Sequence, residues 1–201
     1  MDLEKGNIYH LYNQGNNRGK IFFRKENYHY FLKKIEFHIC PVADLLAWCL
    51  MPNHFHMIIS VPAQSSDRLT PSDRMTSSHP VTLNSSLAIM LRSYTRAINI
   101  QENRSGSLFR ERTKAIWLGS IESEKIKFEN RNKAIPQTWT DLEEEYLHTC
   151  FRYIHNNPVK AGLVEKETDW EFSSARDFAF LRDGPLINRK LCDRLGLIFL
   201  K

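Results

Sequence analysis

The apolar positions of this chain alternate between the two-residue period of a strand and the 3.6-residue period of a helix. Four segments have the composition of strands, and two of them flank a short Met-Pro-Asn turn, which is typical of a hairpin. These segments are IYHLYNQ (8–14), DLLAWCL (44–50), FHMIISV (55–61) and SLFRERTKAIWL (107–118).

Helical spacing predicts two helices between these strands. The first opens near Asn27 as N-cap and stops before Pro41, with apolar positions at Tyr28, Phe31, Leu32, Ile35 and Ile39. The second spans about 85–101, with its apolar stripe at Leu87, Met90, Leu91, Tyr94 and Ile98.

A third helix is predicted over about 141–157. Thr140 and Glu143 form a capping-box pattern at its start, and Pro158 is expected to end it. Its apolar stripe consists of Leu147, Cys150, Phe151 and Ile154. A last short helix is expected near 188–196, while 62–84 and 119–140 have the composition of loops.

The order β-α-β-β-α-β, followed by a long helix, predicts an α+β chain of the ferredoxin-like (RRM-like) class. In that plan a four-stranded antiparallel sheet carries two helices on one face. We expect residues 1–201 to form a single domain with a core of about 7–178 and a tail of about 179–201. Because this fold serves many functions, its function must be argued from a site.

Charge and composition narrow the function only slightly. The net charge is +5 and the pI is about 9.0, which permits nucleic-acid binding without demonstrating it. No apolar run is long enough for a membrane helix and no signal peptide is visible, so the cytoplasm is the expected compartment. The four cysteines are too widely spaced for a zinc knuckle or a redox pair.

His54 and His56 are the first candidate site. On a strand they share one face, while Phe55, Met57 and Ile59 face the core on the other. The histidines should therefore lie on the open face of the sheet. Two imidazoles at this spacing can bind one metal ion, although a pair of surface histidines on a hairpin is the simpler interpretation.

Tyr153 and Asn157 are the second candidate pair. They are four residues apart and therefore neighbours on one helical face, at the edge of the apolar stripe. A boundary tyrosine and a helix-terminal asparagine would also account for them.

Taken together, these segments resemble one family. MPNHFHMIISV is similar to the His-hydrophobic-His (HUH) motif of the IS200/IS605-like Y1 transposases. YIHNNPVKAGLV with DWEFSS resembles the tyrosine helix of the REP-associated tyrosine transposase branch, and YNQGNNRGKIFFRKENYHYFL and SLFRERTKA resemble other parts of it. The resemblance covers about 7–178 with gaps; 119–140 is longer than expected, and the tail after Phe178 has no counterpart.

The resemblance implies a metal-dependent nuclease that cleaves and rejoins single-stranded DNA through a 5′-phosphotyrosine. Tyr153 would be the nucleophile, and His54, His56 and Asn157 would bind Mg²⁺ or Mn²⁺. Single-stranded or hairpin DNA is the implied partner. A monomer is favoured over a dimer, because 119–140 is long enough to let the tyrosine helix fold back on its own sheet.

Basic side chains outside these motifs are candidate DNA contacts, with ordinary solvated charges as the alternative. They are Arg18, Arg92, Arg96, Arg110, Arg112 and Lys114, of which the last three are expected on one face of the strand 107–118.

Two other functions remain open at this point. A non-catalytic single-stranded nucleic-acid-binding module would use the same sheet, but it would present stacking aromatics where this chain has histidines. A hydrolytic metalloenzyme acting on small phosphates would leave Tyr153 without a role.

Overall fold

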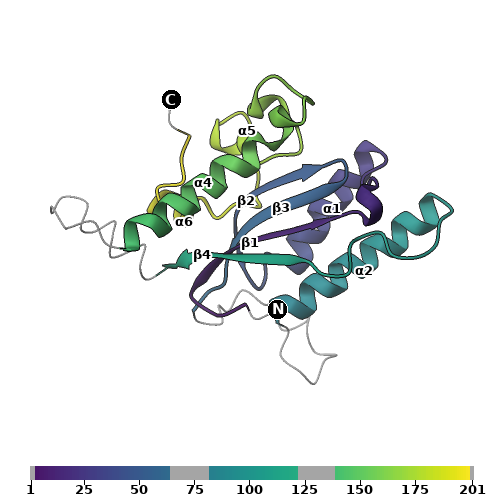
Figure 1. The fold of residues 1–201 in the computed structure, drawn as a ribbon, viewed down its shortest axis with the longest axis horizontal. Coiled ribbons are helices and arrows are strands. Elements are labelled where there is room, and N and C mark those ends of the chain that lie inside the picture. The colour runs from purple at the N-terminus through teal and green to yellow at the C-terminus, as the bar shows by residue number, and fades with distance from the viewer. Residues whose placement is uncertain (1–2, 64–81, 122–138, 200–201) are drawn as a thin grey trace.

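A four-stranded antiparallel sheet forms the centre of the protein (Figure 1). The computed structural model describes residues 3–63, 82–121 and 139–199, with only the course of the helix in 139–145. The strands, in spatial order, are β2 (Asp44–Met51), β3 (His54–Ser60), β1 (Asn7–Gln14) and β4 (Lys114–Ser120). The element order and this strand order confirm the ferredoxin-like class.

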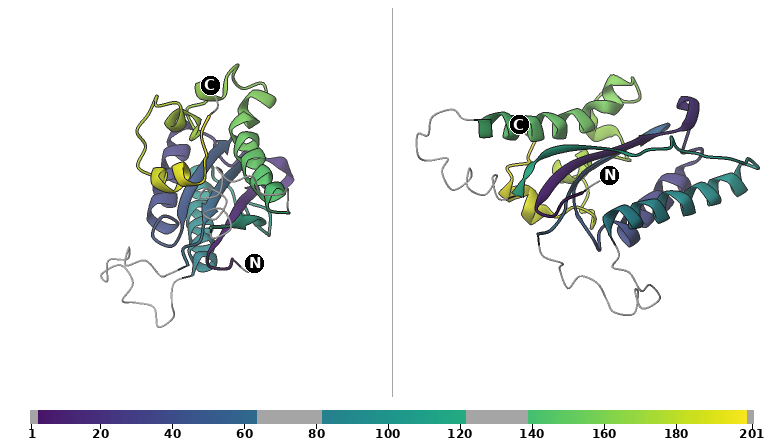
Figure 2. Two further views of the ribbon diagram at one scale, coloured as in Figure 1. Left: turned by 90° about the vertical axis from the view of Figure 1, so that its left-hand side faces the viewer. Right: turned by 60° about the horizontal axis from the view of Figure 1, so that its bottom comes forward.

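One face of the sheet is covered by α1 (Lys25–His38) and α2 (Leu83–Gln101), as Figure 2 shows. Phe55, Met57 and Ile59 of β3 are fully buried in one cluster with Phe31 and Ile35 of α1. The prediction that these residues of β3 face the core is therefore confirmed. His54 and His56 consequently lie on the opposite face of the sheet.

That opposite face is only partly open, contrary to the prediction. The helix α4 (Trp139–Lys160) crosses it (Figure 2), and its Phe151 and Ile154 form a second core with Leu46 and Ile58. The C-terminal segment, with α5 (Ala175–Phe178) and α6 (Arg189–Arg194), adds to this core. Because β2 and β3 carry apolar side chains on both faces, leaving this face open would expose them to water.

Helix boundaries differ from the predictions at the start of α1 and at both ends of α4. α1 begins at Lys25, and Asn27 lies inside its first turn, where Oδ1 accepts hydrogen bonds from the backbone N–H groups of Phe23 and Arg24. α4 begins at Trp139, one residue before Thr140, so Thr140 is not its N-cap.

Pro158 lies within α4 and does not end it. A proline removes one N–H from the helical ladder, which costs little where a single turn remains. That turn is retained, because the backbone N–H of Ala161 donates to the carbonyl of Asn157 at 2.9 Å.

The predicted strand 107–118 is also shorter than expected, since β4 begins only at Lys114. The side-chain amide of Asn13 in β1 donates to the carbonyl of Arg110 and to the hydroxyl of Thr113. These bonds hold the segment before β4 in place of a regular ladder. Arg110 and Arg112 therefore do not share a strand face with Lys114.

A buried polar link joins α4 to β2. His155 Nε2 lies 2.7 Å from Ser174 Oγ, which in turn accepts a hydrogen bond from the backbone N–H of Trp48 at 2.9 Å. Burial lowers the pKa of His155 to about 3. The link therefore uses a neutral imidazole that faces the interior, and His155 is not available as a proton acceptor for Tyr153.

Replacing Phe151 by Ala is expected to destabilise the protein by about 3–5 kcal/mol, because large-to-small changes in a core lose burial and leave a cavity. Phe151 is 1% exposed and packs against Phe178, with ring centroids 4.8 Å apart. Urea denaturation measures the effect. The exposed neighbour Arg152, replaced by Ala, is the control and should change stability by no more than about 0.5 kcal/mol.

The remaining sequence-level features are consistent with this fold. None of the four cysteines forms a disulfide. Among the helices that the structure describes, none combines the length and apolar character needed to span a bilayer.

Candidate functional site

His54 and His56 project from the same face of β3 beneath the C-terminal half of α4. Their ring centroids are 4.9 Å apart, and His56 is the more buried of the two. Tyr153 of α4 lies edge-on to His56, with ring centroids 5.7 Å apart. All three side chains line one cavity of about 270 Å³, hereafter the histidine cavity.

The hydrogen bonds of the two histidines indicate which nitrogens face the cavity. His54 Nδ1 donates to the amide oxygen of Asn53 at 2.6 Å, so His54 Nε2 keeps its lone pair. His56 Nδ1 is 2.8 Å from His10 Nε2. Within the described part of the chain, neither His54 Nε2 nor His56 Nε2 takes part in a hydrogen bond.

Burial keeps these imidazoles neutral. It lowers the pKa of His54 and, more strongly, that of His56, whose pKa the neighbouring His10 and His54 lower further. Neutral imidazole is the form that binds a metal ion. The chemistry of this donor pair therefore fits a divalent ion, which His54 and His56 would hold.

Asn157 is not brought into the same cavity. Its Nδ2 donates to the backbone carbonyl of Tyr153 at 2.9 Å, one turn back on α4, and it does not line the histidine cavity. The residues that the structure describes contain no cluster of three or more His, Cys, Asp or Glu side chains arranged around one point. The structure thus assembles His54, His56 and Tyr153, and leaves Asn157 beside them.

Two residues of this site, His10 and Tyr12 on β1, did not emerge from the sequence analysis. They are two apart and share a face, and Tyr12 pairs directly with His56 across the β1–β3 ladder. The His10 ring lies beside that of His56, with ring centroids 5.0 Å apart. The spacing of His10 and Tyr12 indicates in the sequence that they share a strand face. Only the register of β1 with β3, however, places that face beside His56.

Cationic side chains surround the mouth of the cavity. Arg110 and Arg112 line it from the segment that leads into β4, and Lys114 lines it from the first position of β4. From the other side, the Lys160 ammonium lies 5.3 Å from the centre of the Tyr153 ring. An anion entering the cavity would therefore meet positive charge from two directions.

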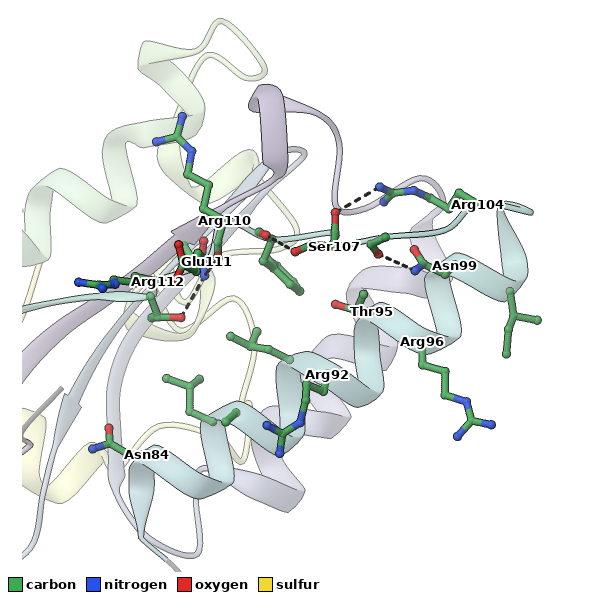
Figure 3. A pocket seen from close by; sticks show the side chains of 18 of the residues that line it. Asn84, Arg92, Thr95, Arg96, Asn99, Arg104, Ser107, Arg110, Glu111 and Arg112 are labelled. Atoms are coloured by element: carbon green, nitrogen blue, oxygen red, sulfur yellow. Dashed lines mark hydrogen bonds between the residues drawn. The ribbon is translucent and has the colours of Figure 1, made fainter.

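A larger cavity of about 1380 Å³ adjoins the first, between α2 and the segment 103–113, and Figure 3 shows it from close by. We call it the α2 groove. It shares Asn13, Arg110 and Arg112 with the histidine cavity, so the two cavities meet at these residues. Its lining combines apolar side chains with five arginines and one carboxylate, namely Arg92, Arg96, Arg104, Arg110, Arg112 and Glu111.

Of the basic residues predicted to contact DNA, all but one line these two cavities. Arg92 and Arg96 lie on the α2 side of the groove, and Figure 3 shows Arg110 directed away from α2. Arg18 is the exception: it lies in the turn Asn16–Arg18, where its carbonyl accepts a hydrogen bond from the side chain of Asn53.

Comparison with known proteins defines the class of fold. No protein-family model matches the chain, and no curated protein matches it. The chain has a four-stranded antiparallel sheet with α1 and α2 on one face and α4 on the other, and this fold is similar to that of one solved tyrosine transposase. The chain is similar to the solved structure of a REP-associated tyrosine transposase bound to a REP hairpin, with a TM-score of 0.52, 18% sequence identity, and coverage of 94% of this chain and 95% of that one. At this identity the similarity concerns the fold.

Proposed function

We propose that this protein is a metal-dependent, single-stranded-DNA endonuclease and strand transferase of the REP-associated tyrosine transposase type. The observation that carries the proposal is the meeting of Tyr153 with His54 and His56 in one cavity. A hydrolase acting on small phosphates has no need of a tyrosine at this place. The fold neighbour, which binds a hairpin, supports DNA as the partner.

In the proposed reaction Tyr153 Oη attacks the scissile phosphorus. The Oη–P bond forms, the bond from phosphorus to the 3′-oxygen breaks, and the 3′-oxygen leaves as a hydroxyl after taking a proton from water. The phenol proton passes to water, because Tyr153 is 42% exposed and His155 is buried elsewhere. A 3′-hydroxyl can reverse the step and join strands without an external energy source.

The remaining side chains have electrostatic roles in this proposal. A divalent ion held by His54 and His56 would polarise a non-bridging oxygen of the scissile phosphate. Asn157, whose amide bonds the Tyr153 carbonyl, would join them only after turning into the cavity. Arg112 and Lys114 attract the phosphate into the cavity, and Lys160 stabilises negative charge that develops on the phenol oxygen.

The α2 groove is the proposed path of the DNA strand next to the scissile phosphate. Its arginines suit phosphates, whereas its apolar lining, which includes Leu87, Leu91 and Phe109, suits unpaired bases. Because Arg110 and Arg112 line both cavities, a strand that follows these arginines would lead from one cavity to the other. This arrangement favours single-stranded over duplex DNA.

Binding to single-stranded DNA should weaken steeply with salt, because phosphate contacts release counterions. The double change Arg110→Gln and Arg112→Gln should reduce the slope of log K against log salt by about 1.4, which is about 0.7 for each lost contact. Fluorescence anisotropy with an oligothymidine measures this. Arg194→Gln on α6, an exposed arginine outside both cavities, should leave the slope unchanged. An unchanged slope in the double variant would contradict the proposal that the DNA strand passes Arg110 and Arg112.

The proposed active unit is one chain. Tyr153 lies over His56 of its own sheet, so exchange of the tyrosine helix between chains is not needed to complete the site. Light scattering is expected to give the mass of a single chain, 23.6 kDa, without DNA, and that mass plus one oligonucleotide when DNA is bound. A stable species of twice that mass would contradict this expectation.

The central test is covalent trapping. Protein incubated with single-stranded oligonucleotides and Mn²⁺ should form an adduct that survives denaturing electrophoresis. Binding without any adduct, over a set of hairpin and linear substrates, would instead indicate a non-catalytic nucleic-acid-binding module. Hydrolysis of a small phosphodiester that persists in Tyr153→Phe would indicate a metallohydrolase.

A further inference from the structure

We propose that His10 is a positioning residue for His56: it accepts a hydrogen bond from the Nδ1–H of His56 and thereby holds His56 Nε2 as the metal-binding nitrogen. This inference rests on the metal site proposed above. It assigns a function to a buried histidine on β1, a strand that contributes none of the proposed ligands.

The geometry of the pair is specific. His10 Nε2 and His56 Nδ1 are 2.8 Å apart, and the rings meet edge to edge with 29° between their planes, as a hydrogen bond between ring nitrogens requires. In the β1–β3 ladder His10 is opposite Ile58 and Tyr12 is opposite His56, so the two histidines are diagonal neighbours on one face. The Tyr12 ring lies 5.0 Å from that of His10 and 5.7 Å from that of His56, which limits the movement of both.

A hydrogen bond between two imidazoles needs one N–H and one lone pair. His10 and His56 are each 5% exposed and in contact, which disfavours a positive charge on either. Two neutral arrangements remain. If His10 donates, the hydrogen of His56 is on Nε2, and that nitrogen cannot bind a metal. If His56 donates, Nε2 has its lone pair free, so only this second arrangement suits the proposed site.

The neighbouring ligand has the same arrangement. His54 Nδ1 donates to the amide oxygen of Asn53, which also leaves Nε2 for the ion. Metal-binding histidines commonly donate their second N–H to a carboxylate or a carbonyl. Here both acceptors are neutral. Such acceptors orient the rings without adding negative charge, so a bound ion keeps more of its positive charge for the phosphate.

The experiment compares two substitutions of His10 with the intact chain. His10→Gln keeps an acceptor oxygen, whereas His10→Phe fills the space without one. Mn²⁺ binding is measured by calorimetry or electron paramagnetic resonance, without DNA. We expect His10→Phe to weaken Mn²⁺ binding by about 10–100-fold, the usual effect of losing such a partner. His10→Gln should stay within about threefold of the wild type, and His29→Phe, on an exposed surface of α1, is the control.

A spectroscopic measurement tests the tautomer directly. Long-range ¹H–¹⁵N correlation spectra of the metal-free protein should show His56 protonated on Nδ1, with a coupling through the hydrogen bond to His10 Nε2. In His10→Phe this coupling is lost and His56 becomes a mixture of tautomers. Circular dichroism establishes whether each variant is folded. If a variant does not fold, the correlation spectrum of the wild type still determines the tautomer of His56.

The outcomes separate this inference from the proposed function. A wild-type His56 protonated on Nε2, or unchanged Mn²⁺ binding in folded His10→Phe, would overturn the role of His10. If His56→Ala also leaves Mn²⁺ binding unchanged, the metal site itself is wrong. If His56→Ala abolishes binding while His10→Phe does not, the metal site stands and His10 is only a packing residue.

Discussion

Replacing Tyr153 by Phe is expected to lower formation of the covalent DNA adduct by about 10³-fold or more, while the affinity for single-stranded DNA stays within about threefold. The substitution removes only the nucleophilic oxygen. The ring, which lies edge-on to His56 and beneath the Lys160 ammonium, stays in place. Denaturing electrophoresis of a labelled oligonucleotide measures the adduct, and anisotropy measures the affinity.

Tyr146 provides a matched control for this experiment. It lies seven residues earlier on the same helix and is 46% exposed, against 42% for Tyr153, but it does not line the histidine cavity. Tyr146→Phe should therefore form the adduct at the wild-type rate. A covalent complex that persists in Tyr153→Phe would show that another group is the nucleophile, and peptide mapping of that complex would identify it.

Replacing His56 by Ala is expected to abolish the adduct through loss of the metal ion and to weaken Mn²⁺ binding by about 100-fold or more. Among the residues that the structure describes, His54 and His56 supply the two imidazoles that line the cavity, and neither Nε2 takes part in a hydrogen bond. Calorimetry measures the binding of Mn²⁺, and the trapping experiment measures the adduct. A chelator added to the wild type should have the same effect on the adduct, and excess Mn²⁺ should restore it.

Because His56 is buried, its removal could also disturb the sheet. His54→Ala is therefore the companion variant: His54 is only half-buried, so its loss should lower Mn²⁺ binding with less effect on stability. His29→Ala, an exposed histidine of α1, is the control for surface histidines. Full adduct formation by a folded His54→Ala variant without Mn²⁺ would contradict a metal-dependent reaction.

Much of this site could be predicted from local patterns. The two-residue period of β3 decides that His54 and His56 share a face opposite Phe55, since a strand alternates its side chains whatever surrounds it. The helical period likewise places Tyr153 away from the buried Phe151. Both statements depend only on the backbone conformation of a few consecutive residues, and the structure agrees with both.

Other features depended on contacts between distant segments. α4 packs on the sheet face that the sequence left open, because apolar positions of β2 and β3 exist on both faces and need a cover. The bend at Arg110–Thr113 follows from the amide of Asn13, nearly a hundred residues away in the chain. No local pattern in 107–118 contains that information.

The sequence by itself therefore determined the order of the elements, the face of the histidines and the helical phase of the tyrosine, because these follow from short-range backbone geometry. Only the tertiary structure decided that His10 lies against His56, that Tyr153 reaches the histidines of its own chain, and that Arg110 and Arg112 line both the α2 groove and the histidine cavity. It also decided that the Asn157 amide turns to the carbonyl of Tyr153. These depend on strand register and on the docking of α4, which are set by the packing of the whole chain.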